Sequence, residues 1–500
     1  MKISSIRFPF LILVFGFWNT NLMGQAGELD TTFGVAGRVT TPAYNGAQAY
    51  SIALEQDGKI IVGGQIKYGS GNFGYGFGLL RYNANGMLDE SFGTEGLGEI
   101  GFATGPSFGY SVAIQPDGKI LLGGCTSYDF ELARYNNNGT LDDSFGMNGL
   151  VSNEIGTAYS MALQGDGKII MTGDNFNLAR YNTDGTLDSS FNENGIVEGD
   201  TSGSAFSVVI QAPDKIIAAG TISGGIGLRR YHADGSVDST FGVNGKVVTQ
   251  VGYQSGANSC LVLSNGKILI VGFSNETEYN FTLANYNSNG TIDSSFDTDG
   301  VAVTHVSTDD NQALSMAIQP DGKIIVVGPS SDSTIADFTV VRYNSNGSLD
   351  ASFGNNGISK TDFSGSTDIA LSVTMQPDGK IIVAGSSTFS GNLEIALARY
   401  LSDLNVGIIS LTTSGNSLFI YPNPIQDKAV LKYALLKDEI INIRLLDISG
   451  VLVQTFINGE RRKKGKQEEV LRINKLVGPG AYVLQISNDT YNLGIKVIIK

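Results

Sequence analysis

Leu141-Asp142-Asp143-Ser144-Phe145-Gly146 (LDDSFG) is one of seven copies of a short motif around which the rest of the chain is organised. The other copies begin at Leu29, Leu88, Leu187, Val237, Ile292 and Leu349, and successive copies start 46 to 59 residues apart. Two further landmarks recur in the same order: a turn written DGK, as at Asp117, and a strand end written RYN, as at Arg134. Regular spacing of this length is typical of a repeat architecture.

The third repeat shows what one unit contains. Four short apolar or alternating segments follow its motif, at residues 149–152, 158–164, 168–173 and 176–182, and Asp166-Gly167 supplies a tight turn between the second and the third. Four strands in about 50 residues are typical of a propeller blade. The sequence therefore predicts a seven-bladed β-propeller of four-stranded blades, with all four strands of a blade supplied by one unit. An open solenoid is the alternative, but the end repeats lack the capping changes that it would need. Closure by strand exchange stays open.

Composition agrees with an all-β chain and marks a boundary near residue 405. The 500 residues include 65 Gly, and residues 25–404 hold 18 Lys and Arg against 40 Asp and Glu, whereas residues 405–500 hold 13 against 8. The acidic repeat region would repel nucleic acid and anionic lipid. Cys125 and Cys260 occupy different phases of the repeat, which favours small buried side chains over a disulfide framework.

The chain is predicted to comprise four segments. Residues 1–24 resemble a secretory signal peptide, since Lys2 and Arg7 precede an apolar stretch at 8–18 that is too short for a comfortable transmembrane helix. Cleavage after Gly24 or after Ala26 is possible, and an uncleaved anchor is the alternative. The β-propeller is placed at 25–401, a linker at 402–417 and a second domain at 418–500. No other stretch is predicted to span a membrane.

The repeated positions are predicted to be structural. Each motif Asp is expected to cap a tight turn, and each motif Phe to wedge between blades, although a ring of ligand-stacking aromatics is the alternative. These residues are Asp30, Phe33, Asp89, Phe92, Asp142, Phe145, Asp188, Phe191, Asp238, Phe241, Asp293, Phe296, Asp350 and Phe353. The turn Asp is further predicted to pair with the strand-end Arg, as in Asp57 with Arg81, Asp117 with Arg134, Asp166 with Arg180, Asp321 with Arg342 and Asp378 with Arg399.

The sequence contains no recognisable catalytic constellation. His232 and His305 are isolated, so no metal site is predicted from them. Residues 182–188 faintly resemble a calcium loop, but the Gly comes two positions early. We expect turn chemistry there, with Ca²⁺ as the minor alternative and no other cofactor.

The two faces of the predicted ring should differ. The DGK turns and the motif links share one face, and the irregular loops share the other, where function tends to reside. The candidate ligand-binding residues are the aromatic and acidic side chains of those loops, namely Tyr68, Phe73, Tyr75, Phe108, Tyr128, Tyr253, Tyr279, Asp309 and Asp310. Sugar or peptide would suit them, although each aromatic could simply pack its own loop.

Two resemblances follow from these motifs. The pattern LDxxFG, DGKII and LARYN over residues 28–400 is similar to the delta-60 repeat, a β-propeller repeat of secreted bacterial proteins. LFIYPNP (418–424), IRLLDISG (443–450) and KLVGPGAYVLQI (475–486) resemble the type A sorting domain of type IX secretion substrates, although residues 478–480 read Gly-Pro-Gly where that family usually has Pro-Ala-Gly. The second resemblance implies a small Ig-like β-sandwich, handling by the type IX machinery, and secretion or outer-surface display after periplasmic transit.

The function expected from these features is a secreted or cell-surface binding or adhesion module. The alternative is a polysaccharide lyase or hydrolase whose site lies in the ring channel, and a third option is a structural surface protein. A glycan or protein partner is expected rather than nucleic acid. The ligand, the oligomeric state and the fate of the sorting domain after export stay open.

Overall fold

The computed structural model describes residues 25–42, 46–67, 75–102, 107–332, 335–363, 365–402, 419–421, 425, 427–435, 437–447, 452–474, 477–478, 480–488 and 492–499. The predicted signal peptide lies outside these residues, as does the predicted linker apart from Ser402. The described residues form strands and turns without a helix. Accordingly, no helix in this part of the chain has the length and apolar character needed to cross a membrane.

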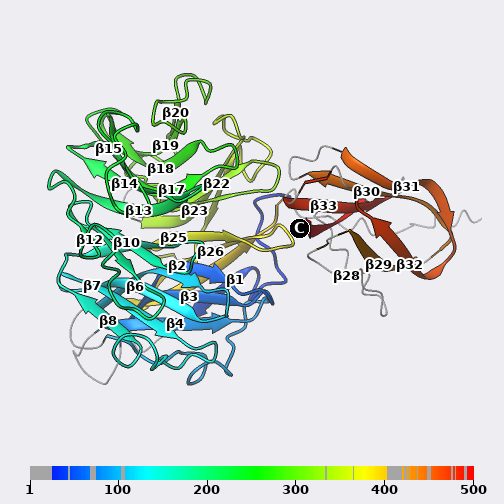
Figure 1. Ribbon diagram of the computed structural model, residues 1–500, viewed down its shortest axis with the longest axis horizontal. Helices are drawn as coiled ribbons and strands as arrows, with labels where there is room; N and C mark the ends of the chain where they lie inside the picture. Colours follow the sequence, from blue (N-terminus) through cyan, green and yellow to red (C-terminus); the bar gives the residue numbers. More distant parts are fainter. Residues whose placement is uncertain are drawn as a thin grey trace, which may run out of the picture.

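Seven antiparallel sheets follow one another around a common axis and form the blades of a propeller (Figure 1). From the innermost strand outward, their strands are β2 (Ala47–Leu54), β3 (Ile60–Lys67) and β4 (Tyr75–Tyr82) in blade 1; β5 (Ser107–Ile114), β6 (Ile120–Thr126), β7 (Asp129–Tyr135) and β8 (Leu150–Asn153) in blade 2; β9 (Ala158–Leu163), β10 (Ile169–Gly173), β11 (Leu178–Tyr181) and β12 (Ile196–Val197) in blade 3; β13 (Gly203–Gln211), β14 (Lys215–Ile222), β15 (Gly225–Tyr231) and β16 (Lys246–Thr249) in blade 4; β17 (Gln254–Val262), β18 (Ile268–Asn275), β19 (Tyr279–Tyr286) and β20 (Val301–Thr304) in blade 5; β21 (Ser315–Ile318), β22 (Ile324–Asp332), β23 (Ile335–Tyr343) and β24 (Ile358–Thr361) in blade 6; and β25 (Asp368–Met375), β26 (Ile381–Phe389), β27 (Asn392–Tyr400) and β1 (Arg38–Thr41) in blade 7. In blade 1 a single bridge from Leu80 to Leu97 takes the place of the fourth strand.

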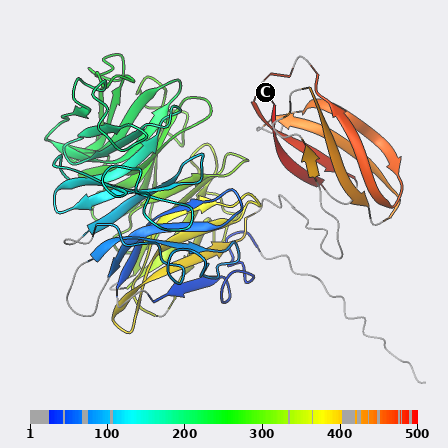
Figure 2. The ribbon, with the colours of Figure 1, turned by 60° about the horizontal axis from the view of Figure 1, so that its bottom comes forward.

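The prediction of a seven-bladed propeller is confirmed, but the assignment of strands to blades was wrong. Each motif lies between the third strand and the outermost strand of one sheet, so a blade combines three strands of one repeat with the first strand of the next. The first motif copy therefore has no blade of its own. Its strand β1 completes blade 7 by pairing antiparallel with β27, from Arg38 opposite Ala398 to Thr41 opposite Ile395. Figure 2 shows this early blue segment beside the late yellow strands.

The hydrophobic cores lie between neighbouring blades. One cluster joins Ile61 and Leu79 of blade 1 to Ile120 and Tyr135 of blade 2, with Phe92 of the motif between them. The second strand of each blade is buried on both faces, as in β3, where every residue from Ile60 to Ile66 is buried. This burial explains why these strands are continuous apolar runs rather than alternating ones.

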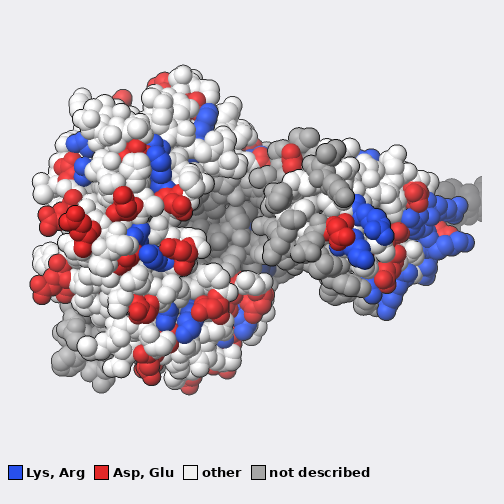
Figure 3. Space-filling model, viewed as in Figure 1, with Lys and Arg blue, Asp and Glu red and all other residues white. Residues whose placement is uncertain are grey.

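The C-terminal unit is a sandwich of two sheets around one core. One sheet contains β28 (Phe419–Tyr421), β29 (Lys428–Leu435) and β32 (Gly465–Arg472), and the other contains β31 (Leu452–Arg462), β30 (Glu439–Asp447), β33 (Gly480–Ser487) and β34 (Asn492–Ile499). Leu431 and Leu471 of the first sheet share a core with Ile443 and Leu484 of the second. Basic side chains gather at one end of this sandwich, whereas acidic ones are scattered over the visible propeller surface (Figure 3).

Candidate functional site

The regular face of the propeller carries a repeated charge cluster built on the motif Asp. In blade 2, Asp142 Oδ2 lies 2.7 Å from Arg134 Nε and 2.5 Å from Lys119 Nζ, while Asp142 Oδ1 accepts hydrogen bonds from the amide and hydroxyl of Ser144. Burial alone would raise the pKa of Asp142, but the hydrogen bonds from Lys119 and Ser144 and the charge of Arg134 hold it well below its usual range. The cluster thus fixes the link between the third and outermost strands.

The predicted pairing of the turn Asp with the strand-end Arg was wrong. The Asp of DGK caps its own turn, as when Asp57 Oδ1 accepts the amide of Lys59 at 3.1 Å. The Arg instead binds the motif Asp, and the Lys of DGK joins it there. The Arg–Asp pairs are Arg81–Asp89, Arg134–Asp142, Arg180–Asp188, Arg230–Asp238, Arg342–Asp350 and Arg399–Asp30. The physical reason is that a turn Asp satisfies nearby backbone donors, which leaves it exposed and turned away from the strand.

Each of these Arg side chains also stacks on a motif Phe. Arg134 Cζ lies 4.4 Å from the centre of the Phe145 ring, and five other blades repeat the contact at 4.5 to 4.7 Å. Phe145 is fully buried in a cluster with Leu132 and Met171 of adjacent blades. Blade 5 departs from the pattern, since Asn285 replaces the Arg and donates to Asp293 at 2.9 Å. These contacts use the motif side chains for packing between blades.

Serines of five blades link the innermost strands of neighbouring blades, a feature that the sequence did not predict. Ser51 Oγ accepts the amide of Val112 in the next blade at 3.0 Å, and Ser111, Ser160, Ser207 and Ser315 repeat this bond at 3.1 to 3.3 Å. Ser259 and Ser372 occupy the same sequence position in the other two blades. A Ser after an aromatic, aliphatic or Asn residue in all seven repeats was the available signal. It is visible as YSIAL, YSVAI, YSMAL, FSVVI, NSCLV, LSMAI and LSVTM.

The residue before each of these serines lies on, or directly before, the innermost strand of its blade. Tyr50, Tyr110, Tyr159 and Phe206 stand at a β-bulge or register shift in the innermost strands of blades 1 to 4. Their rings touch in series, with centroids 4.8 Å apart from Tyr50 to Tyr110, 5.6 Å from Tyr110 to Tyr159 and 5.0 Å from Tyr159 to Phe206. Phe108 stacks on Tyr110 at 5.7 Å. We name these five residues the aromatic arc. Blades 5 to 7 place Asn258, Leu314 and Leu371 at the equivalent position.

Polar groups edge the aromatic arc on the irregular face. Tyr159 Oη donates to Asp174 Oδ1 at 3.2 Å, and Tyr50 Oη donates to Gln48 Oε1 at 2.9 Å. Asp174 lies in the short loop after β10, and its Oδ2 also accepts the amide of Thr157. Burial, with the nearby Asp174 charge, raises the pKa of Tyr159 to about 12, and burial likewise raises the pKa of Tyr50 to about 12. The phenols therefore act as hydrogen-bonding hydroxyls rather than as bases.

The predicted ligand residues fall into separate groups. Phe108 belongs to the aromatic arc, and Tyr75 lies close enough to add to the raised pKa of Tyr50. Tyr128 and Tyr253 are 77% and 80% exposed and stand outside the arc. Tyr68 and Phe73 lie outside the described residues.

The remaining predicted residues gather at blades 5 and 6. The Tyr279 ring packs against Phe273 at 5.3 Å, and Tyr279 Oη donates to Gln254 Oε1 at 3.0 Å. Asp310 Oδ1 accepts the Tyr279 amide at 3.1 Å, and the Asp309 carbonyl accepts from the Asn311 side chain. These contacts join the start of β19 in blade 5 to the segment before β21 in blade 6 and to the start of β17, so the side chains are engaged in holding neighbouring segments together.

Other titratable groups lie apart from the aromatic arc or are deeply buried. Glu131 is 3% exposed inside blade 2, where its Oε1 accepts from Thr126 Oγ1 at 2.6 Å and from Ser152 Oγ at 3.0 Å, and burial raises its pKa to about 7. The loop at 182–188 uses Asp184 Oδ1 to cap the Thr186 amide at 3.0 Å, which is the turn chemistry expected there.

Two family descriptions match the chain. "Domain of unknown function (DUF5122) beta-propeller" matches residues 55–92, 115–145, 164–191, 212–241, 263–296, 319–353 and 376–406. These segments begin next to a DGK turn and mostly end at the motif, so they omit the first motif copy, whose strand completes blade 7. "Secretion system C-terminal sorting domain" matches residues 419–500. Neither description names an enzymatic activity.

Solved structures with a similar outline are propellers of low sequence identity. The WD40 β-propeller domain of Doa1 is 13% identical, with a TM-score of 0.45, covering 75% of this chain and 96% of that one. Sqt1 from Chaetomium thermophilum is 11% identical, with a TM-score of 0.39, covering 79% of this chain and 97% of that one. No curated protein matches the chain. Through its seven repeats the chain belongs to the β-propeller family of unknown function, and its C-terminal sorting domain marks it for type IX handling and for secretion or display on the cell surface.

Proposed function

We propose that this exported propeller is a binding module whose ligand docks on the irregular face, at the mouth of the channel over the aromatic arc. The observation that carries the proposal is the run of five touching rings from four consecutive innermost strands. The rings are partly exposed rather than sealed in a core. Concave sites lined by aromatic rings with a few placed polar groups are typical of ligand pockets.

A glycan is the ligand class that suits this surface best. The apolar C–H face of a sugar ring can lie on an aromatic ring, and its hydroxyls can pair with the acceptors Asp174 and Gln48 at the edge of the arc. Asp174 is the charged group beside the arc, and Tyr159 already orients it. The net acidity of residues 25–404 disfavours acidic polysaccharides, so neutral glycans are expected.

Catalysis is the less favoured function. A lyase that used Tyr159 as a base would need a lowered phenol pKa, whereas burial raises it to about 12. Glu131 has a perturbed pKa, but it is 3% exposed within blade 2 and bonded to Thr126 and Ser152. Neither group is prepared for acid–base chemistry on a bound sugar.

The test is a neutral-glycan array followed by calorimetry on the mature chain, the double variant Tyr110→Ala/Tyr159→Ala and the control Tyr128→Ala. Tyr128 lies on the same face but is 77% exposed outside the arc. Binding should weaken at least about tenfold in the double variant, which corresponds to about 1.4 kcal/mol, and stay unchanged in the control. Near-UV circular dichroism verifies folding. Equal binding by all three proteins would refute the proposed site, and release of shortened sugars would identify an enzyme instead.

A further inference from the structure

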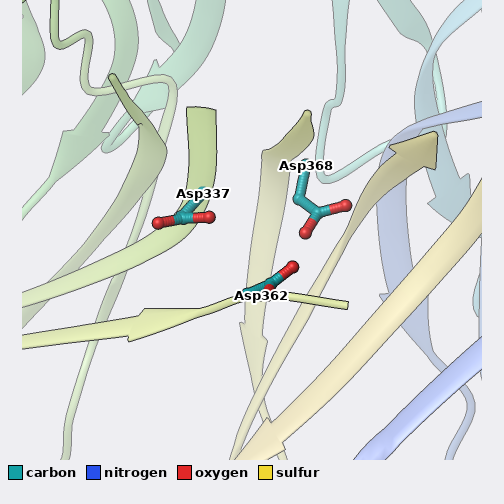
Figure 4. Close-up of side chains that lie close together, drawn as sticks. All are labelled: Asp337, Asp362 and Asp368. Atoms are coloured by element: carbon teal, nitrogen blue, oxygen red, sulfur yellow. The ribbon is translucent and has the colours of Figure 1, made fainter. Parts of the chain in front are cut away.

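Three carboxylates meet at the seam between blades 6 and 7, outside the aromatic arc. Asp337 lies on β23, Asp362 directly follows β24, and Asp368 begins β25. One carboxylate oxygen from each lies within 4.8 Å of the others. Figure 4 shows the three side chains turned toward a common space. Two ligands of one Ca²⁺ ion, each at 2.3–2.6 Å, lie at most about 5 Å apart, so the spacing suits a shared ion.

Asp368 is buried without full hydrogen bonding. It is 0% exposed, and its Oδ2 accepts the Phe363 amide at 2.7 Å, but its Oδ1 is buried with no hydrogen-bond partner. An unsatisfied buried carboxylate oxygen is costly, because the lost hydration is not replaced. Burial raises the pKa of Asp368 and of Asp337, and the neighbouring Asp362 charge adds to both shifts. The group of three carboxylates therefore has too little positive charge around Asp368, its buried member.

A fourth oxygen stands beside Asp368. Ser387 on β26 is the direct cross-strand neighbour of Asp368, and directly opposed residues share one face of a sheet. Ser387 is 0% exposed, and its hydroxyl approaches Asp368 without forming a hydrogen bond of regular geometry. Three carboxylates and one hydroxyl form an all-oxygen set, which suits Ca²⁺ rather than the softer metals that take nitrogen or sulfur.

Two basic side chains lie nearby: the charge of Lys360 partly offsets the raised pKa of Asp337, and both Lys360 and Arg38 also make contacts of their own. Lys360 Nζ pairs with Asp332 Oδ2 at 2.9 Å, and Arg38 Nη1 donates to the main-chain carbonyl of Asp362 at 2.6 Å. Arg38 belongs to β1, the strand that closes the ring. The ring-closing strand therefore contacts the acidic group through Arg38, while β1 itself pairs with β27 within blade 7.

The repeat itself does not require these acids. The position of Asp368, three residues before Leu371, is Ser107 in blade 2, Ser255 in blade 5 and Asn311 in blade 6. Asn311 is also 0% exposed, yet its amide donates to the carbonyl of Tyr279. The acidic group is therefore an addition to one seam rather than a part of the common blade.

We propose that Asp337, Asp362, Asp368 and Ser387 bind one Ca²⁺ ion that joins the outer part of blade 6 to the inner strand of blade 7. Solvent supplies the remaining ligands on the side of Asp362, which is exposed. The ion replaces the missing partner of Asp368 Oδ1 and neutralises the group. It crosslinks blades 6 and 7, so its effect is on stability and is independent of glycan binding.

The test uses the mature chain after chelator treatment, with calorimetric titration of CaCl₂ and, separately, MgCl₂. We expect one Ca²⁺ per chain, weaker or no Mg²⁺ binding, and a thermal unfolding midpoint that rises with Ca²⁺ and saturates. Asp368→Asn and Asp337→Asn should each weaken Ca²⁺ binding at least tenfold and abolish the midpoint shift. Asp332→Asn, which removes the nearby partner of Lys360, is the matched control and should bind as the parent does.

The metal-free variants separate a metal site from a merely structural acid. Without Ca²⁺, Asp368→Asn should be as stable as the parent or more stable, because a repelled buried charge has been removed. Absence of Ca²⁺ uptake by the parent, uptake by Asp368→Asn or Asp337→Asn at parental affinity, or equal loss in Asp332→Asn would overturn the proposal. Should Asp368→Asn not fold, Asp337→Asn alone decides, since Asp337 is only partly buried.

Discussion

Replacing Asp142 by Asn removes one negative charge from a buried cluster but keeps an oxygen that can cap Ser144. The parent side chain is 7% exposed, and its Arg134 partner is 9% exposed. Breaking a buried ion pair by removing one partner costs about 3–5 kcal/mol. Arg134 keeps hydrogen bonds to the Thr183 carbonyl and to Ser144 Oγ. We therefore expect the low end, a loss of about 3 kcal/mol in the free energy of unfolding.

Blade 5 supplies the matched control. Asp293 occupies the same place, but its neighbours are the neutral Asn285 and Lys267, whose side chain is 30% exposed. A partly exposed ion pair is worth about 1 kcal/mol or less. Asp293→Asn should therefore lose at least about 2 kcal/mol less than Asp142→Asn, a difference of roughly thirtyfold in the unfolding equilibrium.

The assay is urea unfolding of the mature chain at pH 7, followed by near-UV circular dichroism, with the slope of each transition checked against the parent. The pH dependence of stability in the same two variants tests whether the Asp142 charge is the cause. Because the folded pKa of Asp142 is lowered, its stabilisation is complete above the unfolded pKa of about 3.9 and fades as pH falls below it. The two variants should therefore converge with the parent in acid. Equal losses in Asp142→Asn and Asp293→Asn at pH 7 would refute the reasoning.

Three further predictions concern other parts of the propeller. The folded pKa of Glu131 is raised to about 7, so ionisation of this side chain destabilises the fold. The free energy of unfolding should therefore fall by roughly 3 kcal/mol as pH rises from about 4.3 to 7. Glu131→Gln should flatten this part of a plot of urea midpoint against pH. A profile that Glu131→Gln leaves unchanged would contradict that account. Burial raises the pKa of both Cys125 and Cys260 to about 12. Native protein at pH 8 should therefore not react with a thiol reagent, whereas urea-unfolded protein should expose two thiols. Rapid labelling of the native protein would contradict this prediction. Deleting residues 25–41 removes β1 and uncovers the edge of β27. The shortened chain should therefore unfold at a lower urea concentration and self-associate, as measured by light scattering. A monomer of parental stability would show that pairing of β1 with β27 is not needed to stabilise the ring.

Three landmarks, each repeated seven times in the same order, were sufficient to predict the seven-bladed fold. A β-strand pattern is local, and apolar runs such as Ile60–Ile66 must be covered on both sides wherever they lie. The same holds for the C-terminal sandwich and its export role, which rest on contiguous motifs. The sequence also separated the repeated face from the irregular one, because loop length and composition are local properties.

The partners of each repeated side chain depended on the tertiary structure. Arg134 could have met the turn Asp or the motif Asp, and only the path of the link between strands brings Asp142 to it. The strand of the first motif copy joins the last blade because the ring closes in space, which the order of the chain does not specify. The aromatic arc combines residues about 50 apart, and the Asp337, Asp362 and Asp368 group combines two blades. Such sites arise where bulges and blade packing aim side chains together, and that geometry is set only when the whole ring forms.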